Sequence, residues 1–259
     1  MKQCYIRFYG RLKSISGKEY WIYSFRNKPT IIDIIEALGV PHTEVYFILK
    51  NQQISGFYDH IYDNDKISAY PKMQYLYIDL YKHIMFDPFL SKKIKKDYWF
   101  KFQNYKISKF IADVHLGKLV KYLRFLGIDI LYNIHWDDTT LIRKSIEEKR
   151  ILLTQDKGIL KQKIVQYGCY IINREPPQQL LEFFNYFSIR AKPFTRCSLC
   201  NHLLIKLSKM EIKENMDYIP SKIKQLYEYF YYCPVCKKYY WEGSHYKKLI
   251  NFYKSMNLL

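Results

Sequence analysis

The sequence has no apolar run close to the roughly 18 residues that a membrane-spanning helix needs. Its first eight residues alternate apolar and polar side chains, so they lack the apolar block of a secretory signal peptide. These two absences exclude a membrane helix and a secretion signal as read from the sequence. We therefore expect a soluble, cytoplasmic protein with no membrane partner.

Acidic residues are scarce relative to basic ones. The 259 residues include 42 Lys and Arg but only 24 Asp and Glu, which gives a formal net charge of +18. Such an excess favours binding to phosphate backbones, so nucleic acid is the expected partner. The alternative is a general bias in residue usage with solvated lysines. The contents of 49% hydrophobic and 18% aromatic residues exclude a chain that is disordered overall.

Residues 1–72 follow the order of a β-grasp, or ubiquitin-like, domain. We expect strands at residues 4–8, 20–25, 45–49 and 66–70 and a helix at residues 31–38. Thr30 and Asp33 are spaced as a capping box at the start of that helix, and Gly39 is placed to end it.

The sequence of this first domain resembles the small sulfur-carrier branch of the β-grasp fold, through residues 7–9 and 36–45 and through Asp65. Carriers of that kind end in Gly-Gly, whereas here the last strand runs into Tyr70 and Pro71. Carrier chemistry is therefore excluded in this form. We expect a docking or stabilising module that offers a surface to a protein partner.

Residues 73–108 are predicted to be a linker with some packed aromatic content. Residues 75–81 have the pattern of a strand, and the basic run at residues 92–96 is either a solvated hinge or a contact to a phosphate backbone.

Strands and helices alternate from residue 109 to residue 190, which predicts a three-layer α/β domain with a parallel sheet. The helices are expected at residues 116–126, 138–148, 157–167 and 177–187.

Three aspartates stand at the ends of these elements. Asp113 and Asp156 follow the strands at residues 110–112 and 151–154, and Asp138 opens a helix. Carboxylates at the carboxyl ends of parallel strands converge on one crevice. Three of them suit catalytic Mg²⁺ or Mn²⁺. The alternatives are a helix N-cap for Asp138, with Asp137 as its rival ligand, and a turn role for Asp156.

A basic stripe follows the first acid. Lys118, Lys121 and Arg124 recur every three residues along the helix predicted at residues 116–126. They are candidate phosphate contacts, and the alternative is the solvated face of an amphipathic helix. Trp241 is a further candidate substrate contact that would stack on a base, unless it packs the C-terminal domain against its neighbour.

Two Cys-x-x-Cys turns stand in residues 191–259, with 32 residues between them. They contain Cys197, Cys200, Cys233 and Cys236. Four thiolates in this arrangement predict the closed structural zinc site of a zinc ribbon. Disulfides are the alternative, which a reducing cytoplasm disfavours.

From residue 110 to about residue 250, the sequence resembles the Mut-seven carboxy-terminal RNase family, a PIN-like fold with an appended zinc ribbon. The matching segments are residues 113–119, 123–127, 138–141, 152–156, 196–201, 233–236 and 240–245. The ubiquitin-like first domain is a known companion of that family.

The resemblance implies a metal-dependent ribonuclease whose acids are Asp113, Asp138 and Asp156. RNA is then the expected substrate, and the zinc ribbon is expected to aid nucleic-acid binding. The alternative is a non-catalytic RNA-binding or adaptor protein with vestigial acids.

Overall fold

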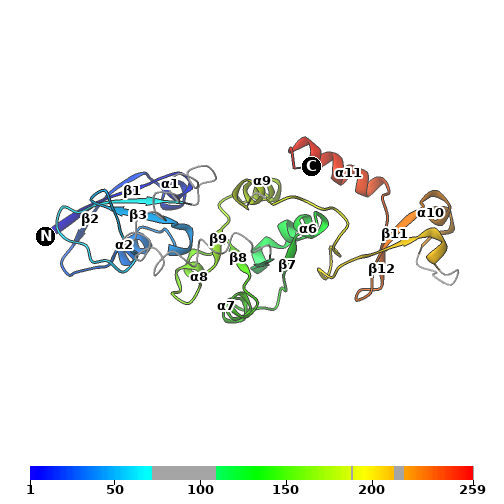
Figure 1. The fold of residues 1–259 in the computed structure, drawn as a ribbon, viewed down its shortest axis with the longest axis horizontal. Coiled ribbons are helices and arrows are strands. Elements are labelled where there is room, and N and C mark those ends of the chain that lie inside the picture. Colours follow the sequence, from blue (N-terminus) through cyan, green and yellow to red (C-terminus); the bar gives the residue numbers. More distant parts are fainter. Residues whose placement is uncertain (72–108, 188, 213–218, 259) are drawn as a thin grey trace, which may run out of the picture. The chain divides into compact units, whose positions relative to one another are not determined.

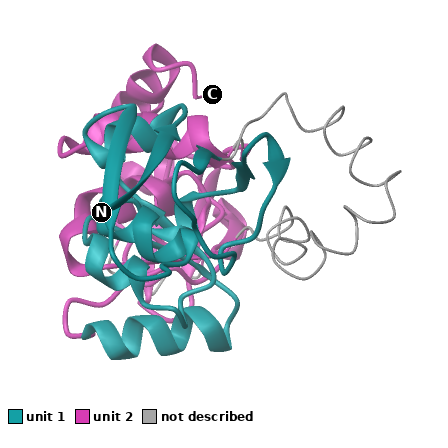
Figure 2. Ribbon diagram, turned by 90° about the vertical axis from the view of Figure 1, so that its left-hand side faces the viewer, with its two compact units in different colours: residues 1–107, 137–172 teal, residues 108–136, 173–259 magenta. Residues whose placement is uncertain are grey.

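The computed structural model describes residues 1–71, 109–187, 189–212 and 219–258 (Figure 1). The chain divides into two compact units. Unit 1 comprises residues 1–107 and 137–172, and unit 2 comprises residues 108–136 and 173–259 (Figure 2). The predicted linker, with its possible strand and its basic run, lies outside the described residues.

A five-stranded mixed sheet forms the first part of unit 1. Its strands are β1 (Lys2–Phe8), β2 (Tyr20–Phe25), β3 (Phe47–Lys50), β4 (Gln53–Ile54) and β5 (Lys66–Tyr70). Their order in the sheet is β2-β1-β5-β3-β4. The parallel pairing of β1 with β5, between antiparallel neighbours, gives the β-grasp arrangement that the sequence predicted.

The helix α2 (Ile31–Ala37) packs on this sheet (Figure 1). Four of its isoleucines are buried in a core that also contains Ile6, Phe8 and Ile67. The predicted capping box is confirmed, since the Thr30 N–H donates to Asp33 Oδ2 at 2.9 Å. The helix therefore begins where its side chains satisfy its first N–H groups.

Two short elements of this domain were not predicted. The segment between β1 and β2 contains helix α1 (Arg11–Ser16), and β4 pairs with β3. Leu12 and Ile15 are the buried residues of α1. Six residues hold only one i, i+3 pair of this kind, which is too little for a helical period to be recognised.

The rest of unit 1 consists of alternating helices and strands. Its elements are α7 (Asp138–Glu147), β8 (Ile151–Thr154), α8 (Lys157–Lys161) and β9 (Gly168–Tyr170). The strands β8 and β9 are parallel, with Leu153 opposite Cys169. The prediction that α8 reaches residue 167 is wrong. Its C-cap, Gln162, is extended, and the Val165 carbonyl lies 3.0 Å from His42 Nε2.

The β-grasp domain contacts this second segment of unit 1 through polar groups. Lys157 Nζ donates to the Ile15 carbonyl, and Lys161 Nζ donates to the Glu36 carbonyl, each at 2.6 Å. Both lysines belong to α8, so two residues of this helix are held by the first domain.

A buried ion pair lies at the same contact. Glu44 is fully buried, and its Oε2 lies 3.4 Å from Arg11 Nε. Its other carboxylate oxygen accepts the N–H of Tyr170, and Arg11 donates to the Tyr170 carbonyl. Both backbone groups of one β9 residue are thus bound by side chains of the β-grasp domain.

Unit 2 begins with a parallel pair of strands and the helices around it. The elements are β6 (Lys109–Ala112), η3 (Val114–Leu116), α6 (Gly117–Phe125), β7 (Asp129–Leu131) and α9 (Pro176–Phe187). Phe110 lies in register with Ile130. Its ring packs edge-on against Phe183 of α9, with centroids 4.9 Å apart. The parallel pairing agrees with the predicted α/β class.

The remainder of unit 2 is a small antiparallel sheet and a final helix. The elements are β10 (Ile205–Ser208), η4 (Lys209–Glu211), α10 (Ser221–Leu226), β11 (Tyr229–Cys233), β12 (Lys238–Tyr240) and α11 (Ser244–Ser255). The strand order is β10-β11-β12. No helix among the described residues has both the length and the apolarity of a membrane span.

Candidate functional site

The four predicted zinc ligands lie together. The sulfur atoms of Cys197, Cys200, Cys233 and Cys236 are within 4.8 Å of one another. The sulfurs of Cys197 and Cys236 are 3.9 Å apart, and those of Cys200 and Cys233 are 3.4 Å apart. Tetrahedral zinc with bonds of about 2.3 Å would separate its sulfur ligands by about 3.8 Å. The donor set and its spacing therefore fit a structural zinc ion.

Hydrogen bonds support the thiolate form of Cys197, whereas burial raises the pKa of Cys233 and of Cys236. The Tyr240 hydroxyl lies 3.0 Å from Cys197 Sγ, and the Cys236 N–H donates to Cys233 Sγ. Burial opposes ionisation of Cys197, but the bonds from Tyr240 and from backbone N–H groups outweigh it and lower its pKa to about 7. Such bonds are typical of a closed zinc site.

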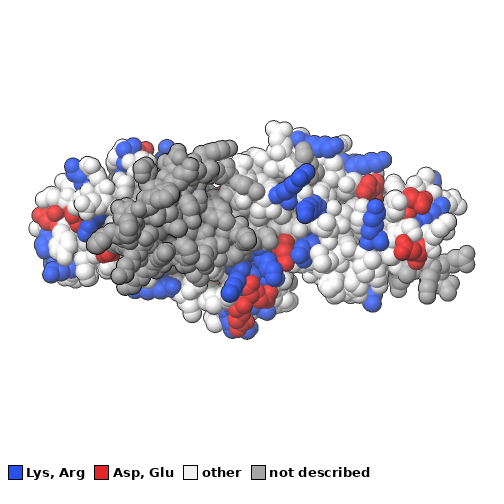
Figure 3. All heavy atoms as spheres, in the orientation of Figure 1, with Lys and Arg blue, Asp and Glu red and all other residues white. Residues whose placement is uncertain are grey.

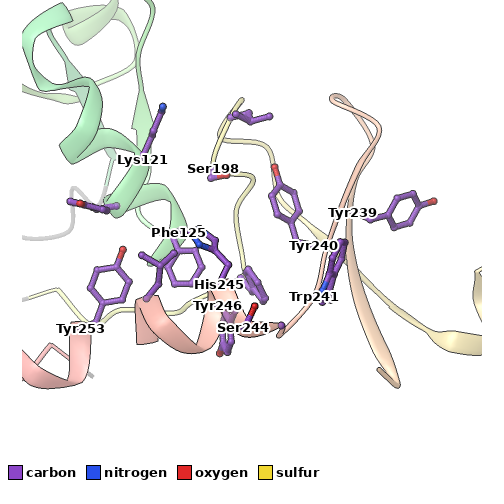
Figure 4. Close-up of a pocket in the computed structure, with 15 residues that line it drawn as sticks. Lys121, Phe125, Ser198, Tyr239, Tyr240, Trp241, Ser244, His245, Tyr246 and Tyr253 are labelled. Atoms are coloured by element: carbon purple, nitrogen blue, oxygen red, sulfur yellow. The ribbon is translucent and has the colours of Figure 1, made fainter. Parts of the chain in front are cut away.

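Replacing Tyr240 with Phe should weaken zinc binding by roughly tenfold or more, because the hydroxyl no longer stabilises the Cys197 thiolate. The measurement is a competition titration with a chromophoric zinc chelator. Tyr239→Phe is the matched control, as its ring belongs to the same strand and points away from the other labelled residues (Figure 4). Equal affinities of the two variants would show that the Tyr240 bond has no part in holding the metal.

The cysteine site is attached to the α/β part of unit 2. Arg124 of α6 donates to the carbonyls of Ile130 and Leu199, the latter lying between Cys197 and Cys200. Asn201 accepts the Ile130 N–H and donates to Asp129. These contacts connect the first Cys-x-x-Cys turn to α6 and β7.

Arg124 is therefore a correction to the predicted basic stripe. Its side chain is buried, with 5% exposure, and it is directed to backbone carbonyls. Arg124 lies three residues after Lys121 but is not on the solvent-exposed face of α6, because the first Cys-x-x-Cys turn covers Arg124. Lys118 and Lys121 are exposed.

Asp113 directly follows β6 and is buried, with 3% exposure. Its Oδ1 accepts the His115 N–H at 2.6 Å, so it caps η3. The predicted position after a buried strand is confirmed.

The structure separates the roles of Asp137 and Asp138. Asp137 is the N-cap of α7 and accepts the Thr140 N–H at 2.9 Å. These bonds to Thr140 lower its pKa. Asp138 is the first helical residue and is exposed. The interpretation of Asp138 as the N-cap is thus wrong, and its carboxylate is not used as the cap.

Asp156 lies two residues after β8 and caps α8, where its Oδ1 accepts the Gly158 N–H at 2.6 Å. Its own N–H donates to the Thr154 hydroxyl. Asp138 and Asp156 belong to unit 1 and Asp113 belongs to unit 2. Their assembly into one metal site stays a prediction.

A basic cavity of about 640 Å³ lies at the start of α6. The basic side chains around it are His115, Lys118, Lys121 and Arg174. Glu175 is the acidic residue on its wall. The sequence did not single out Arg174, which lies 50 residues beyond Arg124 and has no periodic relation to the stripe.

A second cavity, of about 660 Å³, lies beside the first Cys-x-x-Cys turn and contains Trp241 on its wall (Figure 4). Trp241 also packs on the ribbon core of Ile212, Ile219 and Phe230. This contact lies within the C-terminal domain, whereas the packing alternative placed it between that domain and its neighbour. Stacking of Trp241 on a base stays a prediction.

Several solved structures are similar to part of the chain. H. volcanii small archaeal modifier protein 1 is 12% identical over 28% of this chain and all of its own, with a TM-score of 0.25. A putative molybdopterin converting factor, subunit 1, from Pyrococcus furiosus is 15% identical over 28% of this chain and all of its own, with a TM-score of 0.24. No curated protein matches the sequence.

Two family models match. The Mut7-C ubiquitin model matches residues 1–76, and the Mut7-C RNAse domain model matches residues 108–253. The second match covers more than half of the 259 residues and includes the three acids and the four cysteines. The resemblance inferred from the sequence is thereby confirmed, and this chain belongs to the Mut7-C RNAse domain family.

Proposed function

We propose that the protein is a metal-dependent ribonuclease in which Asp113, Asp138 and Asp156 are the catalytic carboxylates. The observation that carries the proposal is the match to the RNAse domain model over residues 108–253, which contain all three. Asp113 and Asp156 follow strands, and Asp138 begins a helix. Asp138 and Asp156 are also exposed, so their carboxylates face solvent.

The chemistry of these residues suits a divalent ion. Carboxylate oxygens are the ligands that Mg²⁺ and Mn²⁺ prefer. When bound, such an ion polarises a phosphoryl oxygen and lowers the pKa of an attacking water. The protein's part is to hold the carboxylates in place, and the N–H groups of His115 and Gly158 orient Asp113 and Asp156. The basic cavity that His115 lines supplies cations for the phosphates.

The test is cleavage of a panel of labelled RNAs and single-stranded DNAs by zinc-loaded protein, with added Mn²⁺ or with none. We expect Mn²⁺-dependent cleavage of RNA that falls roughly 100-fold or more in Asp113→Asn, the scale of losing one transition-state contact. Asparagine still accepts the His115 N–H, so η3 keeps its cap. Glu147→Gln on the exposed face of α7 is the control and should cleave normally.

Full activity of clean Asp113→Asn protein would contradict the assignment. RNA binding without cleavage across the panel would instead support the alternative of a non-catalytic RNA-binding protein.

A pair of neighbouring variants tests which aspartate of α7 acts. Asp138→Asn should lose cleavage to a similar extent as Asp113→Asn. Asp137→Asn should remain active, because Asn is as good an N-cap as Asp and the helix keeps its first turn. The measurement is the single-turnover rate with Mn²⁺. The reverse ranking would move the catalytic role to Asp137.

We also propose a cellular setting and a partner for the protein. We place it in the cytoplasm, where a reducing environment keeps four ribbon cysteines available as metal ligands. The β-grasp domain is proposed to bind a protein through the outer face of β1 and β2. Tyr5 and Ile22 are paired there and are 39% and 64% exposed, and Tyr20 of β2 is 59% exposed.

A further inference from the structure

Two cavities in unit 2 share one residue. Lys121 of α6 lines both the basic cavity at the start of α6 and the cavity beside the first Cys-x-x-Cys turn. Their volumes are about 640 and 660 Å³. A ligand that occupies both would therefore pass along the exposed side chain of Lys121.

The first cavity suits phosphate groups. Lys118, Lys121 and Arg174 bring three basic side chains to it, against the single acidic side chain of Glu175. It is also next to the proposed catalytic acid, since His115 lines it and donates its N–H to Asp113. A phosphodiester in this cavity would therefore meet His115, whose backbone N–H is bound to Asp113.

The second cavity has aromatic walls from three segments. Phe125 comes from α6, Tyr246 from α11, and Trp241 follows β12 (Figure 4). The rings are held by their own contacts. Phe194 stacks on Tyr246 with centroids 4.5 Å apart and meets Phe125 edge-on at 5.4 Å. Such walls are preorganised, so a flat ligand would cost little ordering of the protein.

The charge around the aromatic cavity limits the choice of ligand. Lys121 and His245 are its exposed basic residues. Lys247 and Lys248 extend the basic surface along α11. Figure 3 has the same orientation as Figure 1, and it shows Lys and Arg side chains where Figure 1 places α11. A flat aromatic ring joined to negative charge is the chemistry that matches these walls, and a nucleotide has both parts.

We propose that the aromatic cavity is a base-binding subsite for single-stranded RNA, and that Lys121 leads the adjoining phosphates into the basic cavity. This inference rests on the proposed function and adds a substrate class to it. Bases must be unstacked to enter such a cavity, which selects single strands over duplexes. Recognition by stacking would tolerate different bases, because each has an aromatic face.

The test separates bases from phosphates. Fluorescence anisotropy would compare a labelled single-stranded RNA with an abasic strand of the same length, in buffer without Mg²⁺ or Mn²⁺ so that nothing is cleaved. We expect the full strand to bind roughly tenfold more tightly, since each stacked base contributes on that scale. Equal affinities would overturn the proposal.

Variants of the full-length, zinc-loaded protein locate the effect. Trp241→Leu keeps an apolar side chain on the ribbon core but removes the stacking surface, so binding of the full strand should fall to about the abasic level. Lys121→Ala should weaken both strands and reduce the salt dependence of binding. If Trp241→Leu weakens both strands equally, the cavity does not bind a base.

A second variant covers the case in which Trp241→Leu disturbs the ribbon. Ser244→Leu places a bulkier side chain without an aromatic ring at the cavity, from an exposed position at the start of α11, and removes nothing from the core. It should abolish the preference for the full strand while zinc content stays unchanged. A retained preference would overturn the proposal.

An error in the base-binding subsite can be distinguished from an error in the proposed ribonuclease function. Asp113→Asn should keep the preference for the full strand over the abasic strand, because Asp113 is not among the residues of the aromatic cavity. Cleavage of RNA without a preference for the full strand would support the ribonuclease proposal and contradict the base-binding subsite. A preference for the full strand without any cleavage would support the base-binding subsite and contradict the ribonuclease proposal.

Discussion

Cys233→Ser is expected to abolish zinc binding and unfold the ribbon. Three thiolates and a hydroxyl cannot complete the site formed by the four clustered cysteines. Structural zinc supplies about 10–16 kcal/mol of apparent binding free energy in small zinc modules. The described ribbon core contains only Ile212, Ile219 and Phe230 with a few partly buried neighbours. Hydrophobic burial therefore cannot make up for the loss of the zinc-binding free energy.

The measurement is zinc stoichiometry together with limited proteolysis. We expect loss of the metal and rapid cleavage within the ribbon sheet. Cys4→Ser is the matched control: Cys4 is a buried cysteine of β1, and its sulfur donates to the Tyr23 carbonyl, a bond that a hydroxyl can also make. Full zinc content and a protease-resistant ribbon in Cys233→Ser would contradict a zinc-dependent fold.

Glu44→Ala should destabilise unit 1 by about 3–5 kcal/mol, the usual cost of breaking a buried ion pair. The substitution leaves Arg11 without its carboxylate, and the Tyr170 N–H loses its acceptor. For a domain of this size, the change corresponds to a fall in Tm of roughly 6–20 °C. Thermal unfolding followed by circular dichroism checks it.

Two comparisons make this prediction specific. Glu19→Gln removes the exposed ion pair between Glu19 and Arg7 in the same domain and should leave the Tm almost unchanged, because solvent screens that pair. The double variant Arg11→Met, Glu44→Leu should be more stable than the two single losses imply, because it leaves no unpaired charge. A small effect of Glu44→Ala, equal to that of Glu19→Gln, would show that this contact between the β-grasp domain and β9 is not formed in solution.

Local signals predicted much of the fold correctly. The capping box of Thr30 and Asp33 is one example, because its partners lie three residues apart and need nothing from the rest of the chain. The clustering of the four cysteines is another, since each short Cys-x-x-Cys turn brings two thiols together. The β-grasp order likewise follows from alternation within single strands.

Other predictions were wrong where distant residues decided the outcome. The helix α8 ends at Lys161, and the Val165 carbonyl meets His42, 123 residues away in sequence. Arg124 has the spacing of a surface residue, but the cysteine turn covers it and accepts its hydrogen bond. Neither partner could be recognised from the local pattern.

By itself, the sequence determined the family, the β-grasp and α/β classes, the four cysteines that fit a zinc site and the three acids proposed for catalysis. These depend on residue types at short spacing, which local backbone geometry converts directly into position. Only the tertiary structure decided that Glu44 and Arg11 bind β9, that Arg124 holds the cysteine turn, and that Lys121 joins a basic cavity to an aromatic one. Contacts of that kind depend on how separate segments pack, and packing free energy is distributed over many side chains rather than encoded in one motif.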